Sequence, residues 1–221
     1  MAATRRPIAL TAAVVTAAAL GAAALTLPAF AAERAPGDTP QLELKDGTLD
    51  WGVRESFRKY VTGMAHGEIE VSGGAEQAAD NGPFTFTDGQ GTYDTGTHAT
   101  ETAFKGTVRF SSKLHGFDIT IADLKVRTDR TSGAIEADVT LNGDTQDDIE
   151  LAKLDLSDVR PGQGKGGAMT FADIPATLTA DGAEAFNGMY KEGDALDAAT
   201  LSVTAASAPT DEPTATPTTS P

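Results

Sequence analysis

The sequence predicts a mainly β domain, an antiparallel β-sandwich or barrel-like sheet that carries one or two short helices. Through the middle of the chain, apolar and polar residues alternate with a period of two, which is typical of half-buried strands. Glycine, asparagine and aspartate divide this region into about nine short runs. Only one stretch has a strong helical period, so a fold of alternating strands and helices is not expected.

The first 31 residues have the features of a secretory signal peptide. Arg5 and Arg6 precede an apolar run over residues 8–27, and Ala29-Phe30-Ala31 forms a small-residue cleavage site. The run is long enough to cross a bilayer, which needs about 20 residues, so an uncleaved anchor is the alternative. The arginine pair also permits twin-arginine export.

The folded domain is expected at residues 41–205, after a short linker at residues 32–40. Residues 206–221 read ASAPTDEPTATPTTSP and contain almost no large apolar side chain. Such a segment cannot form a core and is expected to be a disordered tail. No apolar anchor follows the tail, so the mature chain is expected to have no membrane-spanning segment. It would be secreted or associated with the cell wall.

One helix is expected after Asp50, which has the side chain of a typical N-cap, and Gly63 is expected to end it. At 3.6 residues per turn, one stripe of this helix faces the core. The residues of the stripe are Val53, Phe57, Tyr60 and Met64. Ser56 lies one turn before Tyr60, on nearly the same face.

Three runs alternate most strongly, and their inward-facing sets are Phe104, Val108 and Phe110; Phe117, Ile119 and Ile121; and Ile135, Ala137, Val139 and Leu141. Shorter strands are expected at residues 67–71, 83–87, 124–128, 149–154, 176–179 and 200–204. A second helix is expected within residues 182–190, with Ala183, Phe186 and Met189 or Tyr190 facing inward. The glycine-rich loop 160–167 lacks the GKS or GKT ending of a phosphate loop, so it is predicted to be a mobile connection.

The composition excludes several kinds of site. Cysteine is absent, which excludes disulfides, thiolate ligands, covalent c-type haem and a lipoprotein cysteine. The formal net charge is -15, and removing Arg5 and Arg6 with the leader gives -17. Nucleic acid and anionic lipid are therefore not expected as partners, because both need a positive patch.

Tyr60 and His115 point to a function only when they are considered as a pair. Of the three histidines, His66, His98 and His115, only His115 opens a strongly alternating strand. A lone histidine at a strand end is more often a packing or surface residue, and a lone tyrosine on a core stripe is more often part of the core. Neither Tyr60 nor His115 therefore indicates a function alone.

Two longer blocks of sequence carry a family resemblance. The first is LDWGVRESFRKYVTGMAHGEIEV, which contains W-G-V-x-x-S-F-x-x-Y. The second is FKGTVRFSSKLHGFDITIADLKVRT, followed by GAIEADVTL, with G-x-V-x-F and then H-G. In this order, over about 160 residues, they resemble the HtaA family of haem-binding domains found in exported proteins of actinobacteria.

The resemblance implies a β-rich domain with short helices that holds haem non-covalently through an axial tyrosine supported by a histidine. By position, Tyr60 matches the iron ligand and His115 matches its partner. Ser56 matches the serine of the helix block, which binds the propionates or lines the pocket. Phe110 and Phe117 are expected at the pocket wall.

The chemistry of ferric iron agrees with these residue types. Ferric iron is a hard cation, and tyrosinate is a known ligand of haem iron. A free phenol has a pKa of about 10, so coordination must drive its ionisation, and a histidine that donates a hydrogen bond stabilises the phenolate. The expected function is capture of ferric haem and its transfer for iron acquisition. Other haem-uptake proteins or host haemoproteins would be the partners.

The spacing of the second block departs from the family. Family members often have F-x-x-x-H-G, whereas Phe110 and His115 are separated by one residue more. A β-bulge would absorb the extra residue. His66, six residues after Tyr60, is the alternative partner of the tyrosine.

Other functions are less well supported. An enzyme is not expected, because the chain has no cysteine nucleophile and no G-x-S-x-G. A cluster of acidic residues after Leu141 does not have the spacing of an EF-hand, so a solvated turn is expected there. Its members are Asn142, Asp144, Asp147 and Asp148. The remaining alternative is a non-haem binding or structural module of the cell envelope, in which Tyr60 and His115 are only packed.

Overall fold

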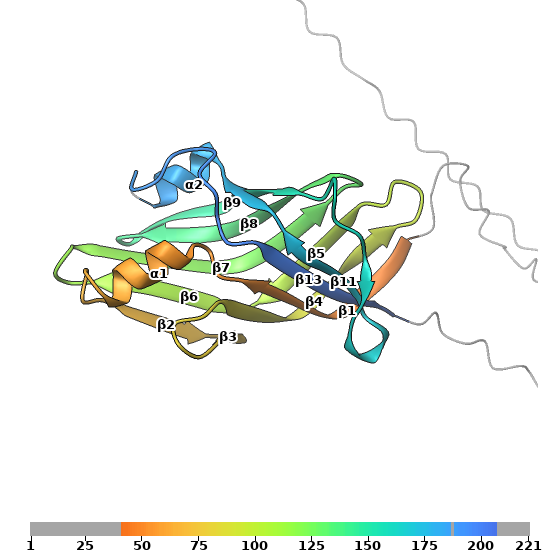
Figure 1. The fold of residues 1–221 in the computed structure, drawn as a ribbon, viewed down its shortest axis with the longest axis horizontal. Helices are drawn as coiled ribbons and strands as arrows, with labels where there is room; N and C mark the ends of the chain where they lie inside the picture. The colour runs from red at the N-terminus through yellow and green to blue at the C-terminus, as the bar shows by residue number, and fades with distance from the viewer. Residues whose placement is uncertain (1–40, 187, 207–221) are drawn as a thin grey trace, which may run out of the picture. The chain divides into compact units, whose positions relative to one another are not determined.

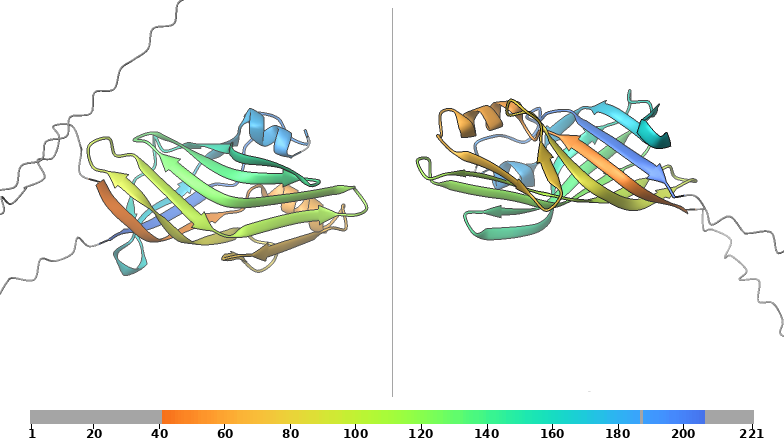
Figure 2. Two further views of the ribbon diagram at one scale, coloured as in Figure 1. Left: turned by 180° about the vertical axis from the view of Figure 1, so that it is seen from behind. Right: turned by 90° about the horizontal axis from the view of Figure 1, so that it is seen from below.

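The structure is a computed structural model, and it describes residues 41–186 and 188–206. The described residues form a single antiparallel sheet that curls into a half-barrel, with two short α-helices (Figures 1 and 2). The mainly β, antiparallel prediction is therefore confirmed. The expected signal peptide, the linker and the tail from residue 207 lie outside the described residues.

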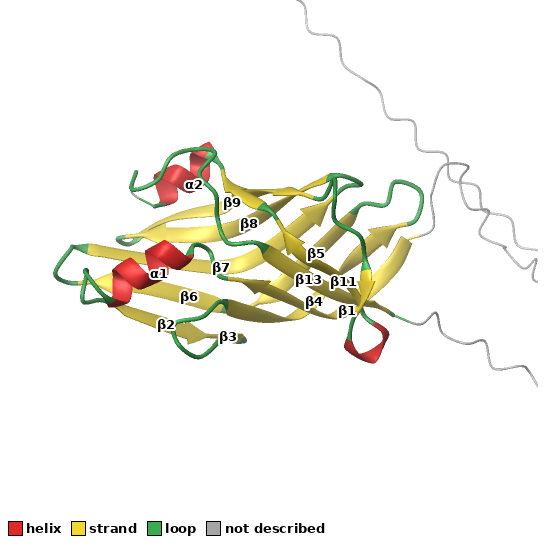
Figure 3. Ribbon diagram, in the orientation of Figure 1, coloured by secondary structure: helices red, strands yellow, loops and turns green. Residues whose placement is uncertain are grey.

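Thirteen strands are found in the described part of the chain, and they dominate Figure 3. They are β1 (Gln41–Trp51), β2 (Glu68–Ser72), β3 (Ala75–Gln77), β4 (Phe84–Asp94), β5 (Thr100–Lys105), β6 (Thr107–Ser112), β7 (Phe117–Thr128), β8 (Ser132–Leu141), β9 (Asp144–Asp155), β10 (Gly162–Gln163), β11 (Met169–Ile174), β12 (Ala176–Leu178) and β13 (Ala199–Ala205). The helices are α1 (Glu55–Thr62), α2 (Ala180–Ala185) and the 3-10 turn η1 (Lys165–Gly167).

The sheet runs in the order β10-β11-β13-β1-β4-β5-β7-β8-β9-β12, and β6 pairs with both β2 and β7. The first and last long strands, β1 and β13, are therefore neighbours in its middle. Both helices lie at the end of the sheet where β6 turns into β7 (Figure 1), with α1 against β2 and β6 and α2 against β8 and β9. This arrangement brings the helix that carries Tyr60 next to the turn that carries His115.

The strongest alternating runs are strands with the expected faces inward. The sets beginning at Phe104, Phe117 and Ile135 are buried, apart from the half-buried Leu141. The first run is divided into β5 and β6 by Gly106, whose φ is +136°. The runs at 117–121 and 124–128 are one strand, β7, interrupted by a register shift between Ala122 and Lys125.

The start of α1 differs from the prediction. Asp50 is not the N-cap: it lies in β1, where its carboxylate accepts a hydrogen bond from the Thr85 hydroxyl at 2.5 Å. Arg54 occupies the cap position without a side-chain hydrogen bond, and the amide of Glu55 instead donates to the carboxylate of Asp197 at 2.8 Å. A residue far along the chain therefore caps this helix.

The end of α1 is partly as predicted. Gly63 is the C-cap. Met64 follows it outside the helix and is 73% exposed, so its assignment to the buried stripe was wrong. The helical spacing of buried residues stops with the helix, so Met64 does not lie in the core.

Two further segments need correction. The second helix, α2, begins and ends earlier than residues 182–190, with Thr179 as an N-cap that accepts from the Gly182 amide at 2.9 Å. The glycine-rich loop is more than a connection, because Gly162 and Gln163 pair with β11 and residues 165–167 form η1. The described residues contain no helix long and apolar enough to cross a membrane.

Candidate functional site

Tyr60 lies at the edge of an aromatic cluster built around Phe57 of α1. Phe57 is fully buried, and its ring centroid lies 5.0 Å from that of Phe110, 6.3 Å from Phe117 and 5.2 Å from Phe186. Tyr60 is only half-buried, and its ring stacks 6.1 Å from Phe117. The cluster fixes the base of the tyrosine and leaves its hydroxyl near the surface.

The Tyr60 hydroxyl oxygen lies 2.6 Å from Nδ1 of His115, and the two rings meet edge to face at 5.5 Å. The histidine is exposed, and it sits in the tight turn between β6 and β7. The structure therefore brings together the two residues that the sequence selected.

Ser112 holds the turn that carries His115. Its buried hydroxyl donates to the carbonyl of Ala65, beyond α1, at 2.6 Å and accepts from the His115 amide at 3.0 Å. Gly116, at a φ of +66°, closes the turn with an amide hydrogen bond to the Ser112 carbonyl at 2.8 Å. One serine thus ties the histidine turn to the end of the tyrosine helix.

The extra residue between Phe110 and His115 is accommodated without the expected bulge. β6 pairs with β2 and with β7 in continuous register. The additional residue lies in the turn after Ser112. His66, the alternative partner, lines a cavity of about 130 Å³ with Glu68, Ser111 and Lys113, and Tyr60 is bonded to His115 instead.

The other three expected site residues have different surroundings. Ser56 is exposed and accepts a hydrogen bond from Nε of Arg54 at 3.0 Å. Phe117 is buried directly under Tyr60. Phe110 has no exposed surface and lies between Phe57 and Phe84, so it supports the cluster from behind rather than lining an open wall.

Sequence reasoning did not select Tyr190 and Arg54 for the site. The Arg54 guanidinium lies 4.4 Å from the centre of the Tyr190 ring, and this ring packs 6.1 Å from Phe57. Burial raises the pKa of the Tyr190 hydroxyl above its usual value, opposed by its hydrogen bond with Ser56 and by the charge of Arg54. The spacing of Phe186 and Tyr190 was the available signal, but nothing local linked them to α1.

Exposed apolar side chains adjoin the site residues in the sequence. Met64 follows α1, Leu114 precedes His115, and Met189 precedes Tyr190. They are exposed by 73%, 68% and 39%, and with Leu42 they are the large hydrophobic residues most exposed in the described chain.

The chemistry of the site follows from its donors. A phenol whose oxygen is 2.6 Å from an imidazole nitrogen can pass its proton or share it when a cation approaches. The resulting phenolate is a hard oxygen ligand. No group of three or more His, Asp or Glu residues is arranged to hold a bare metal ion in the described residues.

The acidic turn between β8 and β9 makes contacts of a structural kind. The Asn142 side chain accepts a hydrogen bond from the Asp118 amide at 2.9 Å, and Asp148 pairs with Lys125. All four members of the cluster are exposed.

Comparison with known proteins places the chain in a family. The model of the HtaA family, described as Htaa, matches residues 46–202. The N-terminal domain of HtaA from Corynebacterium glutamicum is 28% identical with a TM-score of 0.57, covering 74% of this chain and 99% of that domain. A comparison with curated proteins found no significant match.

Two further solved structures have the same fold. The C-terminal domain of HtaA from Corynebacterium glutamicum has a TM-score of 0.64 at 23% identity, covering 73% of this chain and 98% of that domain. The haem-binding protein HtaB from the same organism has a TM-score of 0.54 at 22% identity, covering 75% of this chain and 96% of that one. The family match spans most of the described domain and includes both Tyr60 and His115, and the chain therefore belongs to the HtaA family.

Proposed function

We propose that this chain binds ferric haem non-covalently through Tyr60, and that it is an exported protein that captures haem and passes it on for iron acquisition. The observation that carries the proposal is the 2.6 Å contact between the Tyr60 hydroxyl and His115 Nδ1 at a half-buried surface. The family membership and the haem-binding neighbour HtaB support it.

The surrounding residues fit a haem group. Tyr60 would provide the iron ligand, and His115 would stabilise its ionised form. Met64, Leu114 and Met189 would cover the apolar edge of the macrocycle, and Arg54 with Ser56 would face its carboxylates. When bound, the group supplies a ferric ion that favours an anionic oxygen. A tyrosinate site of this kind suits retention and transfer in an oxidising environment outside the cell.

The proposal is tested by titrating hemin into the purified chain and recording absorbance. We expect a Soret band and a ferric phenolate charge-transfer band with about one haem bound tightly per chain. Tyr60→Phe keeps the ring and removes only the ligand oxygen, so it should lose the tight phase and the part of the charge-transfer band that accompanies it. Tyr93→Phe is the matched control at a distant tyrosine and should keep the tight phase. Equal spectra for the parent and Tyr60→Phe would sink the ligand assignment.

Export and transfer need separate measurements. Fractionation of the producing cells should place the protein in the medium or cell wall, and retention in the cytoplasm would contradict export. Mixing the haem-loaded chain with apomyoglobin should show release of haem to a second protein. No transfer over hours would favour haem storage instead.

A further inference from the structure

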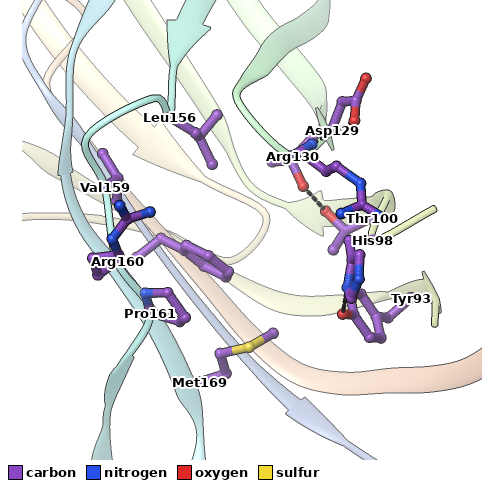
Figure 4. Close-up of a pocket in the computed structure, with 12 residues that line it drawn as sticks. Tyr93, His98, Thr100, Asp129, Arg130, Leu156, Val159, Arg160, Pro161 and Met169 are labelled. Atoms are coloured by element: carbon purple, nitrogen blue, oxygen red, sulfur yellow. Dashed lines mark hydrogen bonds between the residues drawn. The ribbon is translucent and has the colours of Figure 1, made fainter. Parts of the chain in front are cut away.

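A second tyrosine–histidine pair lies at the other end of the sheet, in a cavity of about 190 Å³ (Figure 4). The cavity is lined by the β4–β5 loop, the turn after β7, the segment from Leu156 to Pro161 and strand β11. In Figure 1 the β4–β5 loop lies at the end of the sheet opposite α1 and the β6–β7 turn. It is therefore separate from the proposed haem site.

The pair repeats the geometry of the first one. The Tyr93 hydroxyl oxygen lies 2.6 Å from Nδ1 of His98, the same two atoms and the same distance as between Tyr60 and His115. The β4–β5 loop holds His98 in place, because its amide donates to the Asp94 carbonyl at 2.8 Å. The Asp94 carboxylate in turn accepts from the amides of Gly96 and Thr97, each at 2.8 Å. The imidazole is therefore fixed against the phenol by a closed loop.

The rest of the lining favours an anionic ligand with an apolar part. Arg130 and Arg160 face the cavity, and Asp129 is its one carboxylate. The lining is thus net positive in a chain whose formal net charge is -15. Arg130 is positioned by its guanidinium, which donates to the Gly96 carbonyl at 3.2 Å. Two guanidinium groups near one phenol are suited to carboxylates that accompany a metal.

An apolar wall stands opposite the Tyr93–His98 pair. Val159, Pro161 and Met169 are placed across the cavity from the two rings in Figure 4. Cavities that enclose a drug-sized ligand are typically about 300–1,000 Å³. A cavity of about 190 Å³ can therefore take a small complex, or one edge of a larger one, and binding should be weaker than at an enclosed site.

We infer that the Tyr93–His98 cavity binds a ferric complex that carries carboxylate groups, with Tyr93 as the iron ligand and Arg130 and Arg160 as the carboxylate partners. Hemin and ferric citrate share this chemistry. The phenol gives up its proton to solvent as its oxygen replaces a water molecule or hydroxide on the iron, His98 stabilises the resulting phenolate, and no electron is transferred. The inference does not depend on Tyr60, since the proposed ligand, histidine and arginines of this cavity all come from elements other than α1 and the β6–β7 turn.

The test starts from the double variant Tyr60→Phe/His115→Ala, which lacks the ligand of the proposed first site. This protein is titrated separately with hemin, ferric citrate and iron-free protoporphyrin. A phenolate-to-iron charge-transfer band should appear with hemin, with ferric citrate or with both, and the ligand that produces it identifies the source. Adding Tyr93→Phe should remove the band.

The arginines and His98 give independent readouts. In the double variant, Arg160→Ala and Arg130→Ala should each weaken binding about 10-fold, and the affinity of the double variant itself should fall as salt is raised. His98→Ala should weaken binding about 10-fold or more. Thermal unfolding of each variant checks that the sheet remains folded.

Three results would overturn the inference. The first is the absence of a charge-transfer band with either ferric ligand in the double variant. The second is a band that survives Tyr93→Phe. The third is protoporphyrin binding as tightly as hemin, which would leave iron without a role. A failure of the Tyr60 assignment would be seen instead in the parent and Tyr60→Phe spectra, so the two proposals fail separately.

Discussion

Arg58 and Asp197 form an ion pair at 2.5 Å that joins the middle of α1 to the segment just before β13. The arginine is buried, with an exposed fraction of 4%, and its guanidinium also donates to the carbonyls of Gly52 and Asn81. The Asp197 carbonyl accepts from the Trp51 indole at 3.0 Å. One aspartate therefore holds both the start of the tyrosine helix and the end of β1.

Replacing Asp197 with alanine should destabilise the fold by about 3 kcal/mol, because it leaves a buried guanidinium without its counter-charge. Urea unfolding followed by tryptophan fluorescence measures this. Asp194→Ala is the matched control: its pair with Arg54 is longer, at 3.4 Å, and Asp194 is 40% exposed. Asp194→Ala should lower the free energy of unfolding by less than about 1 kcal/mol. Similar losses for the two variants would contradict a special role of Asp197.

His115→Ala should speed the release of haem to apomyoglobin by about 10- to 100-fold while leaving binding detectable, as is usual when the support of a metal ligand is removed. His66→Ala removes the alternative histidine and should leave the rate unchanged, because Tyr60 is bonded to His115. Faster release from His66→Ala and an unchanged rate for His115→Ala would show that His66 replaces His115 as the partner of Tyr60 when haem is bound.

Gly106→Ala should lower the free energy of unfolding by about 2–4 kcal/mol, since the added methyl group is both crowded by its neighbours and strained by a positive φ. The added carbon would lie 2.8 Å from the Phe86 ring and 2.9 Å from the Ala75 side chain, at a φ of +136°. Gly143 also has a positive φ, +97°, but no atom lies within 4 Å of the carbon. Its replacement should cost about 1 kcal/mol, from the backbone alone. Chemical unfolding of the two variants side by side separates crowding from backbone strain.

The fold should lose stability at high pH in part through Tyr190. Burial raises the pKa of its hydroxyl above the unfolded value of 10.0, so the folded state keeps the proton more strongly than the unfolded chain. This contribution is present below pH 10 and is lost as pH rises through the folded pKa. Tyr190→Phe cannot ionise, and its stability should fall less between pH 9 and pH 12 than that of the parent, measured as the urea midpoint at each pH. Parallel pH curves would rule out this titration.

Several parts of the fold could be predicted because their signal is local. The alternation of residues 117–121 and 135–139 survives in β7 and β8, since each strand has one face in the core. Phe57 and Tyr60 lie on one helical stripe, as predicted, because α1 includes both residues. In β1 the register shifts between Lys45 and Thr48, and in β11 between Phe171 and Ile174. These shifts interrupt the alternation of apolar and polar residues, so neither strand could be predicted from its sequence pattern.

The candidate site shows the same division between local and distant signals. Tyr60 is placed by the helix that carries it, and His115 was selected through the family resemblance. Asp197, Tyr190 and Arg54 meet only after the chain has folded. Asp50 has the side chain of an N-cap, yet the helix begins later and takes its cap from residue 197. Local propensity could not have identified a cap that lies 142 residues away.

The long-range cap makes the tyrosine helix depend on the far end of the domain. A chain that stops before Asp197 would contain Tyr60, His115 and every residue of their aromatic cluster. It would lack the carboxylate that caps Glu55 and neutralises Arg58. During synthesis, α1 can therefore gain these two contacts only after residue 197 has been made. The position of α1 is therefore tied to the completion of the chain, although Tyr60 and His115 both lie in its first two thirds.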